Sequence, residues 1–235
     1  ADLVLYVDVD SNGRDDVVVA MASAGMLVVY APAKTVVDVG VTGVAAMAVA
    51  DVDADADVDI VLALAAELRW YVNNGDGSFA PSALVSSAVA GADSIAIADL
   101  DGDGRPDLAA AASGPGSVVW LRATGPLGIF AAPATVATFQ LGVRALAAVD
   151  ADGDGDVDLA AAVVGSNAVV WFDNADSSFT PRTVAGGLVG LAPALATGDI
   201  NNDGRPDFVA AHAGRVVWIA SRSTSGWLAP AAMVT

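Results

Sequence analysis

Acidic side chains recur in this sequence at a spacing that suits the binding of a divalent cation. A nine-residue motif of the form D-x-[DN]-x-[DN]-G-x-x-D, or close to it, occurs five times and begins at Asp8, Asp51, Asp99, Asp150 and Asp199, so the copies are 43, 48, 51 and 49 residues apart. Carboxylate, amide and main-chain oxygens that alternate along a tight loop are the ligands that Ca²⁺ takes in proteins. We therefore expect up to five calcium sites, one in each copy.

The expected ligands are the side-chain oxygens at positions 1, 3, 5 and 9 of each motif and the main-chain carbonyl at position 7. An arginine at position 7 in three copies fits a main-chain ligand, because its side chain would repel a cation. In motif order the ligand sets are Asp8, Asp10, Asn12, Arg14 and Asp16; Asp51, Asp53, Asp55, Asp57 and Asp59; Asp99, Asp101, Asp103, Arg105 and Asp107; Asp150, Asp152, Asp154, Asp156 and Asp158; and Asp199, Asn201, Asp203, Arg205 and Asp207.

Position 6 is where such a loop turns sharply, and we expect a positive φ there. Four motifs have glycine at this position, whereas the second has Ala56. A left-handed backbone costs an alanine about 1–2 kcal/mol. The second motif is therefore predicted to be the weakest of the sites with four carboxylates, or to have a distorted loop.

An EF-hand, a magnesium site and a metal-free acidic turn each fit the motif less well than a calcium loop. An EF-hand needs a bidentate Glu at position 12, where these motifs have Val19, Leu62, Ala110, Ala161 and Ala210. Mg²⁺ retains several waters, for which so many protein oxygens leave little room. An acidic turn without metal is disfavoured because carboxylates crowded within nine residues repel one another.

Each motif stands between two short apolar runs, which we expect to form neighbouring strands. The run before the motif is rich in alanine, as in residues 44–49, and the run after it is apolar without alternation, as in residues 159–161. Such runs are typical of strands that are covered on both faces. The motif is therefore expected to be the loop between the first two strands of a repeating unit.

A third segment of each unit carries an aromatic residue, and a fourth segment follows a proline. The aromatic residues are Tyr30, Trp70, Trp120, Trp171 and Trp218. The bulky residues and the prolines that follow them are Tyr30/Pro32, Phe79/Pro81, Phe130/Pro133, Phe179/Pro181 and Leu228/Pro230. Proline lacks an N–H donor and is tolerated at the outer edge of a sheet. We interpret the aromatic series as packing between units, with stacking on sugars as the alternative.

Four short strands in 43–51 residues predict an all-β fold, a β-propeller of five four-stranded antiparallel blades, each with a calcium-binding loop between its first two strands. The expected blades of this single domain span residues 1–43, 44–91, 92–141, 142–190 and 191–235. Five complete blades use the whole length, so a closed five-bladed ring is expected. The alternative is a piece of a larger ring, which would leave two apolar blade faces in water.

The composition excludes several classes of protein. A formal charge of −18 with only ten Lys and Arg leaves no basic patch for nucleic acid. A hydrophobic content of 55% excludes an acidic disordered tail. No apolar run approaches the roughly 18 residues of a membrane helix. The chain has no cysteine, so disulfides do not hold the fold, and Ala1 is not a start methionine, so we expect that a leader or flanking region was removed.

Two stretches resemble a known repeat family. Residues 169–174, Val-Val-Trp-Phe-Asp-Asn, and residues 73–79, Asn-Asn-Gly-Asp-Gly-Ser-Phe, look like the third strand and the following turn of the FG-GAP/VCBS repeat family, which includes the propellers of integrin α-subunits. The VCBS-type branch fits better, because the F-G and G-A-P signatures are not literally present. The resemblance covers all five units. It implies a calcium-stabilised propeller, usually extracellular or at the cell surface, used in adhesion or in binding glycans or proteins.

The calcium sites are interpreted as structural. Ligands that lie within nine residues of one loop hold one hairpin together and offset the repulsion between its carboxylates. Direct coordination of a bound ligand by the calcium is the alternative.

Few residues are available for catalysis, which favours a binding module over an enzyme. The chain has one His, one Glu and one Lys, and no nucleophile elbow, phosphate loop or zinc motif. The expected partner is a glycan or an extracellular protein, without nucleic-acid binding or membrane insertion. Alternatives are a carbohydrate-active enzyme such as a polysaccharide lyase, or its accessory domain, with His212, Tyr71 and Arg69 as candidates, and a structural repeat array of a larger surface protein. Trp227 is an isolated candidate for an exposed sugar platform.

Overall fold

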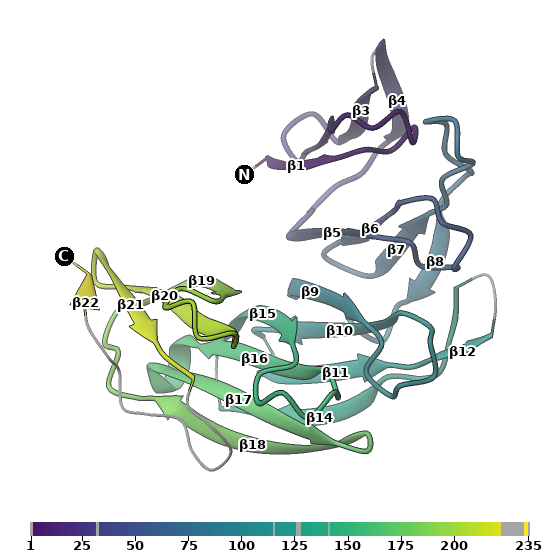
Figure 1. The fold of residues 1–235 in the computed structure, drawn as a ribbon. Helices are drawn as coiled ribbons and strands as arrows, with labels where there is room; N and C mark the ends of the chain where they lie inside the picture. The colour runs from purple at the N-terminus through teal and green to yellow at the C-terminus, as the bar shows by residue number, and fades with distance from the viewer. Residues whose placement is uncertain are drawn as a thin grey trace.

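The computed structural model describes residues 2–31, 33–114, 116–125, 128–140, 142–221 and 233–234. Over these residues the chain is all-β and forms five four-stranded antiparallel sheets, which are the blades of a propeller (Figure 1). Trp227, Leu228 and the prolines at 32 and 230 lie outside the described residues. Within the described ranges, no helix is long and apolar enough to cross a membrane.

Each blade is formed by successive strands, and we number the blades 1 to 5 in chain order. Blade 1 consists of β1 (Leu3–Val7), β2 (Asp16–Met21), β3 (Met26–Ala31) and β4 (Ala33–Val39), and blade 2 of β5 (Ala46–Ala50), β6 (Asp59–Ala63), β7 (Leu68–Tyr71) and β8 (Ala83–Ser86). Blade 3 consists of β9 (Ala92–Ala98), β10 (Asp107–Ala112), β11 (Ser117–Leu121) and β14 (Ala134–Thr138), and blade 4 of β15 (Val143–Val149), β16 (Asp158–Val163), β17 (Ala168–Ala175) and β18 (Ser178–Ala185). Blade 5 consists of β19 (Leu191–Gly198), β20 (Asp207–His212), β21 (Arg215–Ile219) and β22 (Met233–Val234).

Two short features stand outside this four-strand plan. A hairpin of β12 (Ala123–Gly125) and β13 (Ile129–Phe130) lies in the connection from β11 to β14, and a 3₁₀ turn (Val164–Ser166) joins β16 to β17. Neither was expected from the sequence. Both lie in connections, so neither changes the order of strands in a blade.

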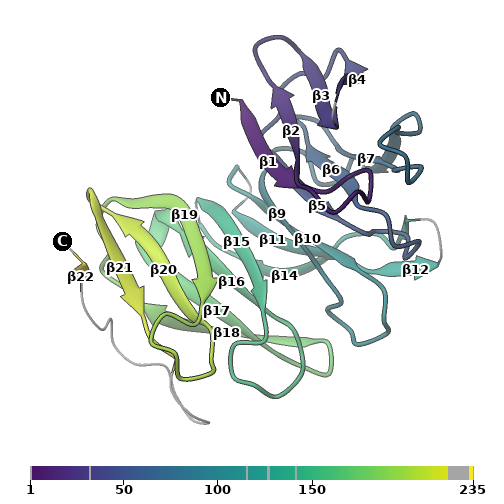
Figure 2. The same cartoon turned by 45° about the horizontal axis from the view of Figure 1, so that its top comes forward.

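The first strands of the blades, β1, β5, β9, β15 and β19, lie side by side along the inside of the arc (Figure 2). Alanine is frequent in them, as in residues 46–50 and 145–148. Small side chains let these crowded inner strands approach one another. The acidic loops follow directly at the ends of these strands, so every loop emerges at the same side of the propeller.

Hydrophobic cores lie between consecutive blades, and each core uses alternate residues of two second strands. The last Asp of each motif, which we call the closing Asp, begins the second strand. In blades 2, 3 and 4, the first and third residues after it pack on the preceding blade, and the second and fourth pack on the next. In blade 2, for example, Ile60 and Leu62 lie in the core shared with blade 1, whereas Val61 and Ala63 lie in the core shared with blade 3. We call these two sides of a blade its backward face and its forward face.

The tryptophans of the third strands lie on the forward faces. Each pairs with the second residue after the closing Asp; the pairs are Val61–Trp70, Ala109–Trp120, Ala160–Trp171 and Val209–Trp218. An aromatic residue of the next blade belongs to the same core as the indole in two cases. Phe130 lies in the core that contains Trp70, and Phe179 meets Trp120 edge-on with ring centroids 5.8 Å apart.

The inclusion of Tyr30 in the tryptophan series was wrong by one residue. Tyr30 pairs with Val17, the first residue after its closing Asp, while Val29 pairs with Val18 and stands at the tryptophan position. A shift of one residue along a strand moves a side chain to the other face. Tyr30 therefore lies on the backward face of blade 1.

The blades follow an open arc and not the closed ring that was expected. Among the described residues, the two end blades, β1–β4 and β19–β22, do not meet, and a gap separates them (Figure 1). The rotation from one blade to the next is set by how their faces pack, and five such steps leave the circle incomplete. That all five blades form one domain stays a prediction.

Candidate metal centres in the acidic loops

Three carboxylates converge in each of the first four acidic loops. They come from positions 1, 3 and 9 of the motif, and in each group one oxygen per residue lies within 4.8 Å of the others. The groups are Asp8, Asp10 and Asp16; Asp51, Asp53 and Asp59; Asp99, Asp101 and Asp107; and Asp150, Asp152 and Asp158. Oxygens bound to one calcium ion at 2.3–2.6 Å can be no more than about 5 Å apart. The triads therefore have the spread that a single hard cation requires.

Backbone hydrogen bonds to the first Asp of the motif fold the loop around these carboxylates. In the third loop, Asp103 N–H donates to Asp99 Oδ1 at 3.1 Å and Gly104 N–H donates to Asp99 Oδ2 at 2.8 Å. Equivalent pairs occur at Asp8, Asp51 and Asp199. In the fourth loop the first donor is Gly153, at 2.7 Å from Asp150 Oδ1. The first Asp is thus fixed in place by its own loop.

The closing Asp is the buried member of each triad, and in the second, third and fourth triads both of its oxygens accept hydrogen bonds. In blade 2, Asp59 is 0% exposed, and it accepts from Val52 N–H at 3.1 Å and from Asn73 N–H at 2.8 Å. These bonds tie the start of the loop and the end of the third strand to the second strand. A closing Asp therefore contributes a carboxylate to the triad and also holds strands of the blade together.

Burial and crowding work against the negative charge in these loops. Burial raises the pKa of Asp59 and of Asp158 to about 6, and it also raises the pKa of Asp107. At position 3, burial followed by repulsion from Asp55 raises the pKa of Asp53. A cation held among these carboxylates would favour their ionised form.

Two positions of every loop have a left-handed backbone, and the sequence identified only one of them. At position 6, φ is +76° in Ala56 and between +82° and +99° in Gly13, Gly104, Gly155 and Gly204. At position 4, φ is also positive, in Ser11, Ala54, Gly102, Gly153 and Asn202. The second loop thus holds two left-handed alanines. A Cβ at any of the four position-6 glycines would meet no atom within 4 Å, so an alanine there is costly only in conformation.

Position 5, an expected ligand, lies outside the four triads. Its side chain accepts a hydrogen bond from the N–H of position 7 in every loop, as in Asp154 Oδ1 with Asp156 N–H at 2.9 Å. In the fifth loop Asn201 replaces the position-3 carboxylate, so that loop has no triad of acidic residues. Ligation by the residues at positions 5 and 7, and by the fifth loop, stays a prediction.

Arg122 is a cation beside the third loop that the sequence did not single out. It lies just after β11, where its guanidinium pairs with Asp101 and lies 4.0 Å from Asp103 Oδ2. The corresponding residues after β7 and in β17 are Val72 and Asp173. The positive charge of Arg122 partly neutralises the carboxylates of the third loop, and this distinguishes the third loop from the second and the fourth.

Two buried asparagines connect neighbouring loops and were also missed. Asn174 donates from Nδ2 to Leu100 O at 2.9 Å and to Val157 O at 2.8 Å, so it bridges the loops of blades 3 and 4. Asn73 bridges blades 1 and 2 in the same way. The sequence shows that each asparagine lies three residues after a tryptophan. It does not show the hydrogen bond that each asparagine makes to a loop 64 or 74 residues away.

Of the three residues considered for catalysis, Tyr71 and Arg69 lie together beside Asp38, and His212 lies apart from them. Tyr71 donates from its hydroxyl to Asp38 Oδ2 at 2.9 Å, and Arg69 pairs with Glu67 and lies 3.6 Å from Asp38. Burial raises the pKa of Tyr71 to about 12. These groups lie between blades 1 and 2, whereas His212 is in blade 5 at the other end of the arc (Figure 1).

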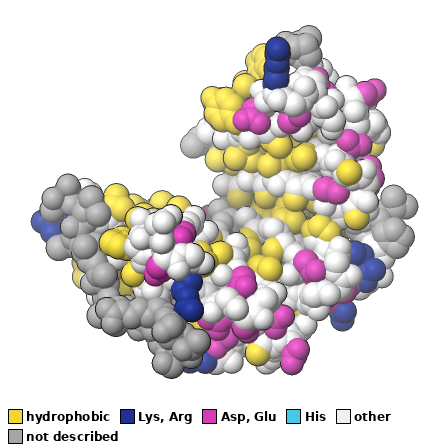
Figure 3. Space-filling view, viewed as in Figure 1, with side chains coloured by type: hydrophobic (Ala, Val, Ile, Leu, Met, Phe, Trp, Pro, Cys, Tyr) yellow, Lys and Arg dark blue, Asp and Glu magenta, His cyan; other side chains and the backbone are white. Residues whose placement is uncertain are grey.

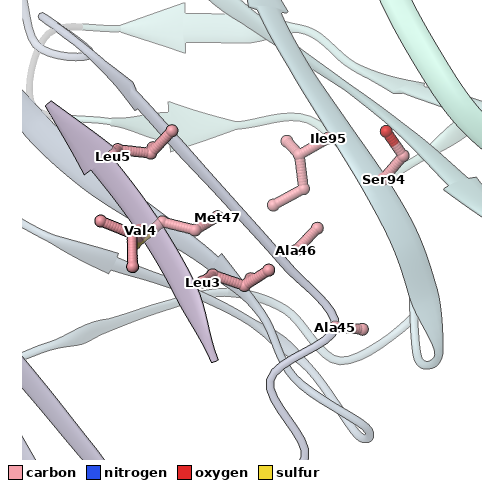
Figure 4. A pocket seen from close by; sticks show the side chains of 8 residues that line it. All are labelled: Leu3, Val4, Leu5, Ala45, Ala46, Met47, Ser94 and Ile95. Carbon is pink, nitrogen blue, oxygen red and sulfur yellow. The ribbon is translucent and has the colours of Figure 1, made fainter. Parts of the chain in front are cut away.

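A hollow of about 230 Å³ lies along the inner strands of blades 1 to 3 (Figure 4). Its lining is almost wholly aliphatic and includes Leu5, Met47 and Ile95. Ser94 contributes a hydroxyl, which also accepts a hydrogen bond from Leu146 N–H at 3.0 Å. The hollow therefore offers few polar side chains.

The sequence matches the model of the FG-GAP-like repeat over residues 51–110, 99–161 and 150–210. The chain belongs to the FG-GAP-like repeat family. Each match begins at the first Asp of one motif and ends in the second strand of the next blade. Successive repeats therefore overlap at the acidic loops. No protein of curated function has a sequence that matches the chain.

Several solved structures share the fold at low sequence identity. A lectin of Agrocybe aegerita that recognises non-reducing terminal N-acetylglucosamine has a TM-score of 0.72 and 19% identity, and the match covers 98% of this chain and 65% of that chain. The V. cholerae biofilm matrix protein Bap1 has a TM-score of 0.50 and 15% identity, with 93% and 37% covered. BBS1N, from a complex with ARL6DN, has a TM-score of 0.52 and 13% identity, with 82% and 58% covered. The FG-GAP-like chain thus spans less than two thirds of each of these proteins.

Proposed function

We propose that this protein is a calcium-stabilised β-propeller that binds glycans outside the cell and is not itself an enzyme. The observation that carries the metal part is the convergence of three carboxylates in four loops at a spread of at most 4.8 Å. The similarity of the fold to that of a glycan-binding lectin supports the ligand class.

Calcium suits the triads better than other common cations. All the side-chain ligands are oxygens, which hard cations prefer, and Ca²⁺ takes more protein oxygens than Mg²⁺ does. When bound, the ion would supply positive charge among carboxylates that repel one another. The first and third positions and the closing Asp would hold it within one loop. Binding of this kind stabilises the folded state, because the unfolded chain lacks the site.

An extracellular location is part of the proposal. Calcium in the millimolar range outside cells would keep sites of modest affinity filled. Membership of the FG-GAP-like family supports this location, because such repeats are typical of extracellular and surface proteins.

The similarity of the fold to that of a lectin supports a glycan as the ligand. The distance of His212 from the other candidate catalytic residues favours binding over catalysis. Among the candidates for acid–base chemistry, Tyr71 is hydrogen-bonded to Asp38 and Arg69 is ion-paired, whereas His212 lies in another blade. A repeated scaffold with loops at one side is suited to recognition. Loops at the ends of the propeller and the seams between blades are the surfaces we expect to bind.

A glycan array tests this function. Labelled protein in millimolar calcium is expected to bind a defined group of glycans, and those that end in N-acetylglucosamine are the first to examine. Retention of a single extracellular protein without any glycan would contradict the ligand class. Degradation of a polysaccharide by the purified protein, followed as new reducing or unsaturated ends, would contradict the assignment as a non-enzyme.

A calcium-free arm separates the two parts of the proposal. Because the ion is proposed to hold loops and not ligand, binding after chelation should fall only as far as the folded fraction falls, measured by circular dichroism on the same sample. Loss of glycan binding by a fully folded, calcium-free protein would show that the ion contacts the glycan.

A further inference from the structure

Two neighbouring inner strands have a bulge at the same place, and each bulge holds a charged residue. β9 pairs with β10 on both sides of Asp93 but not at Asp93 itself, because the register shifts there. β15 does the same at Arg144 in its pairing with β16. The inner strands of blades 1 and 2 pair with their second strands without a register shift. A β-bulge changes the direction of a side chain, and bulges are frequent beside functional sites.

The two charged side chains face each other across the seam between blades 3 and 4. Arg144 Nη1 lies 3.7 Å from Asp93 Oδ1, which is too long for a hydrogen bond, and the two side chains are 47% and 26% exposed. The other carboxylate oxygen, Asp93 Oδ2, accepts a hydrogen bond of 2.9 Å from Ser113 N–H, which fixes the carboxylate. Within the described residues Arg144 makes no hydrogen bond, so its N–H groups are available to a ligand.

A pocket of about 390 Å³ lies at this ion pair, on the inner side of blades 3 to 5. Its polar side chains are Asp93, Arg144 and Ser94, and the rest of the lining is aliphatic and includes Leu195. Ser94 Oγ accepts a hydrogen bond of 3.0 Å from Leu146 N–H, and in the part of the chain that the structure describes its own hydrogen has no acceptor. An apolar lining with a few convergent polar groups, at this volume, is typical of a site for a small ligand.

The pocket is open to solvent and separate from the acidic loops. Figure 3 shows the molecule hollowed between the two end blades, with hydrophobic side chains along both sides of the hollow. Three residues of the pocket lining, Ala194, Ala196 and Val216, are exposed. Asp93 and Arg144 lie at the starts of their inner strands, whereas the acidic loops follow the ends of these strands. A ligand in the pocket would therefore not contact the metal centres.

The chemistry of the ion pair selects a neutral ligand that both donates and accepts hydrogen bonds. The carboxylate of Asp93 only accepts, and the guanidinium of Arg144 only donates. A carboxylate on the ligand would be repelled by Asp93, and an ammonium group would be repelled by Arg144. The formal charge of −18 also disfavours polyanions. A sugar hydroxyl group both donates and accepts, and the C–H face of a sugar ring suits an aliphatic lining.

We propose that this pocket binds one neutral sugar residue of a glycan. Two neighbouring hydroxyl groups of the sugar would bond Asp93 Oδ1 and the guanidinium of Arg144, and Ser94 would donate to a further oxygen. The C–H face of the ring would pack on Leu195 and on the exposed alanines beside it. This proposal rests on the proposed glycan-binding function, to which it adds the place of binding and the charge of the sugar.

The experiment titrates the 235-residue chain in millimolar calcium with the methyl glycosides of N-acetylglucosamine, glucose, galactose and mannose, followed by saturation-transfer NMR. Glucuronic acid and alanine are the charged probes. Asp93→Asn and Arg144→Gln each remove one partner, and Ala196→Phe fills the pocket without changing the ion pair. Arg182→Gln is the control, because Arg182 forms an exposed ion pair with Asp173 that reaches the outer strand of the same blade as Arg144.

At least one of the four glycosides is expected to bind, and the charged probes are not. The three pocket variants should each weaken the binding about tenfold or more, since each loses a hydrogen bond to a charged group or the space for the ring. Arg182→Gln should change it by less than about twofold. The melting temperatures of Asp93→Asn and Arg144→Gln should stay within about 2 °C of the parent, because an exposed ion pair contributes little to stability.

The glycan array is repeated with the same variants, so that the pocket and the proposed function are tested separately. Equal binding of a glycan by the parent and by the folded pocket variants would reject the pocket and leave the glycan function standing. A parent that binds no glycan would reject the function and the pocket with it. Binding of glucuronic acid or alanine in place of all four glycosides, lost in Arg144→Gln, would overturn the assignment to a neutral sugar.

Discussion

The side-chain amide of Asn73 donates a hydrogen bond of 2.7 Å to the main-chain carbonyl of Val9, a residue of the preceding blade. The same nitrogen donates to Val58 O at 3.1 Å in its own blade. Two acidic loops are therefore held side by side through one buried amide. Asn174 repeats the arrangement between blades 3 and 4, so the loops stabilise the propeller across blades as well as within them.

Asn73→Ala is expected to lower the free energy of unfolding by about 1–3 kcal/mol, because it leaves carbonyls without a donor at a buried position. In a chain of this length that corresponds to a fall of about 2–10 °C in melting temperature. Thermal unfolding followed by circular dichroism measures it. Asn74→Ala is the matched control, since Asn74 is exposed and its side-chain amide donates to Ser78 Oγ in its own turn. Equal effects of the two substitutions would show that the bridge contributes nothing.

Glycine at Ala54 and Ala56 is expected to stabilise the second loop. Both alanines have a left-handed backbone, at φ +65° and +76°, and each conformation costs an alanine about 1–2 kcal/mol. Part of that gain is offset by the greater freedom of glycine in the unfolded chain. We expect a net gain of about 1 kcal/mol for each substitution and a several-fold tighter calcium site in that loop, measured by calorimetry.

The control for this prediction is Ala66→Gly, at an exposed turn residue whose φ is not positive. It should be neutral or destabilising. If the glycine variants at 54 and 56 behaved like the control, the strain assigned to the second loop would be absent.

Arg122→Gln is expected to raise the affinity of the third loop for calcium. The guanidinium of Arg122 pairs with Asp101 and so places a positive charge where the ion would bind. Removal of a unit charge about 5 Å away in a solvated site is worth about 1 kcal/mol, or roughly a fivefold change in affinity. Without calcium, the same variant should melt lower than the parent, because Asp101 loses its ion-pair partner.

Arg144→Gln is the matched variant for Arg122. Arg144 forms an ion pair with Asp93 at 3.7 Å, and neither residue belongs to an acidic motif. It should leave calcium affinity unchanged. A parallel change in both variants would mean that overall charge, and not the position of Arg122, sets the affinity.

The architecture was predictable because each blade repeats the same local rules. The acidic motif fixed the loop between the first two strands, and apolar runs on both sides of it predicted strands such as β16, which is buried throughout. The convergence of positions 1, 3 and 9 also follows from the spacing within one short loop. Contacts inside nine residues depend little on the rest of the chain.

The parts that could not be predicted depend on neighbours. Val17, Val18 and Val19 are identical residues, yet only Val18 is fully covered, because blade 1 has a blade on one side only. Nothing in three consecutive valines records which face is open. Tyr30 was misplaced for a related reason, since an aromatic residue one position away from the tryptophan site points to the opposite face. The partners of Asn73 and Arg122 lie in other segments of the chain and were visible only in the fold.

The central claim is that the acidic loops hold calcium and that the calcium stabilises the blades. The most direct test is the melting temperature of the purified chain by scanning calorimetry, in EDTA and over a series of calcium concentrations, with magnesium as the comparison. We predict a melting temperature that rises with calcium concentration, as expected for an ion that binds only the folded state, and a smaller rise with magnesium. The same melting temperature in EDTA and in saturating calcium would contradict the account.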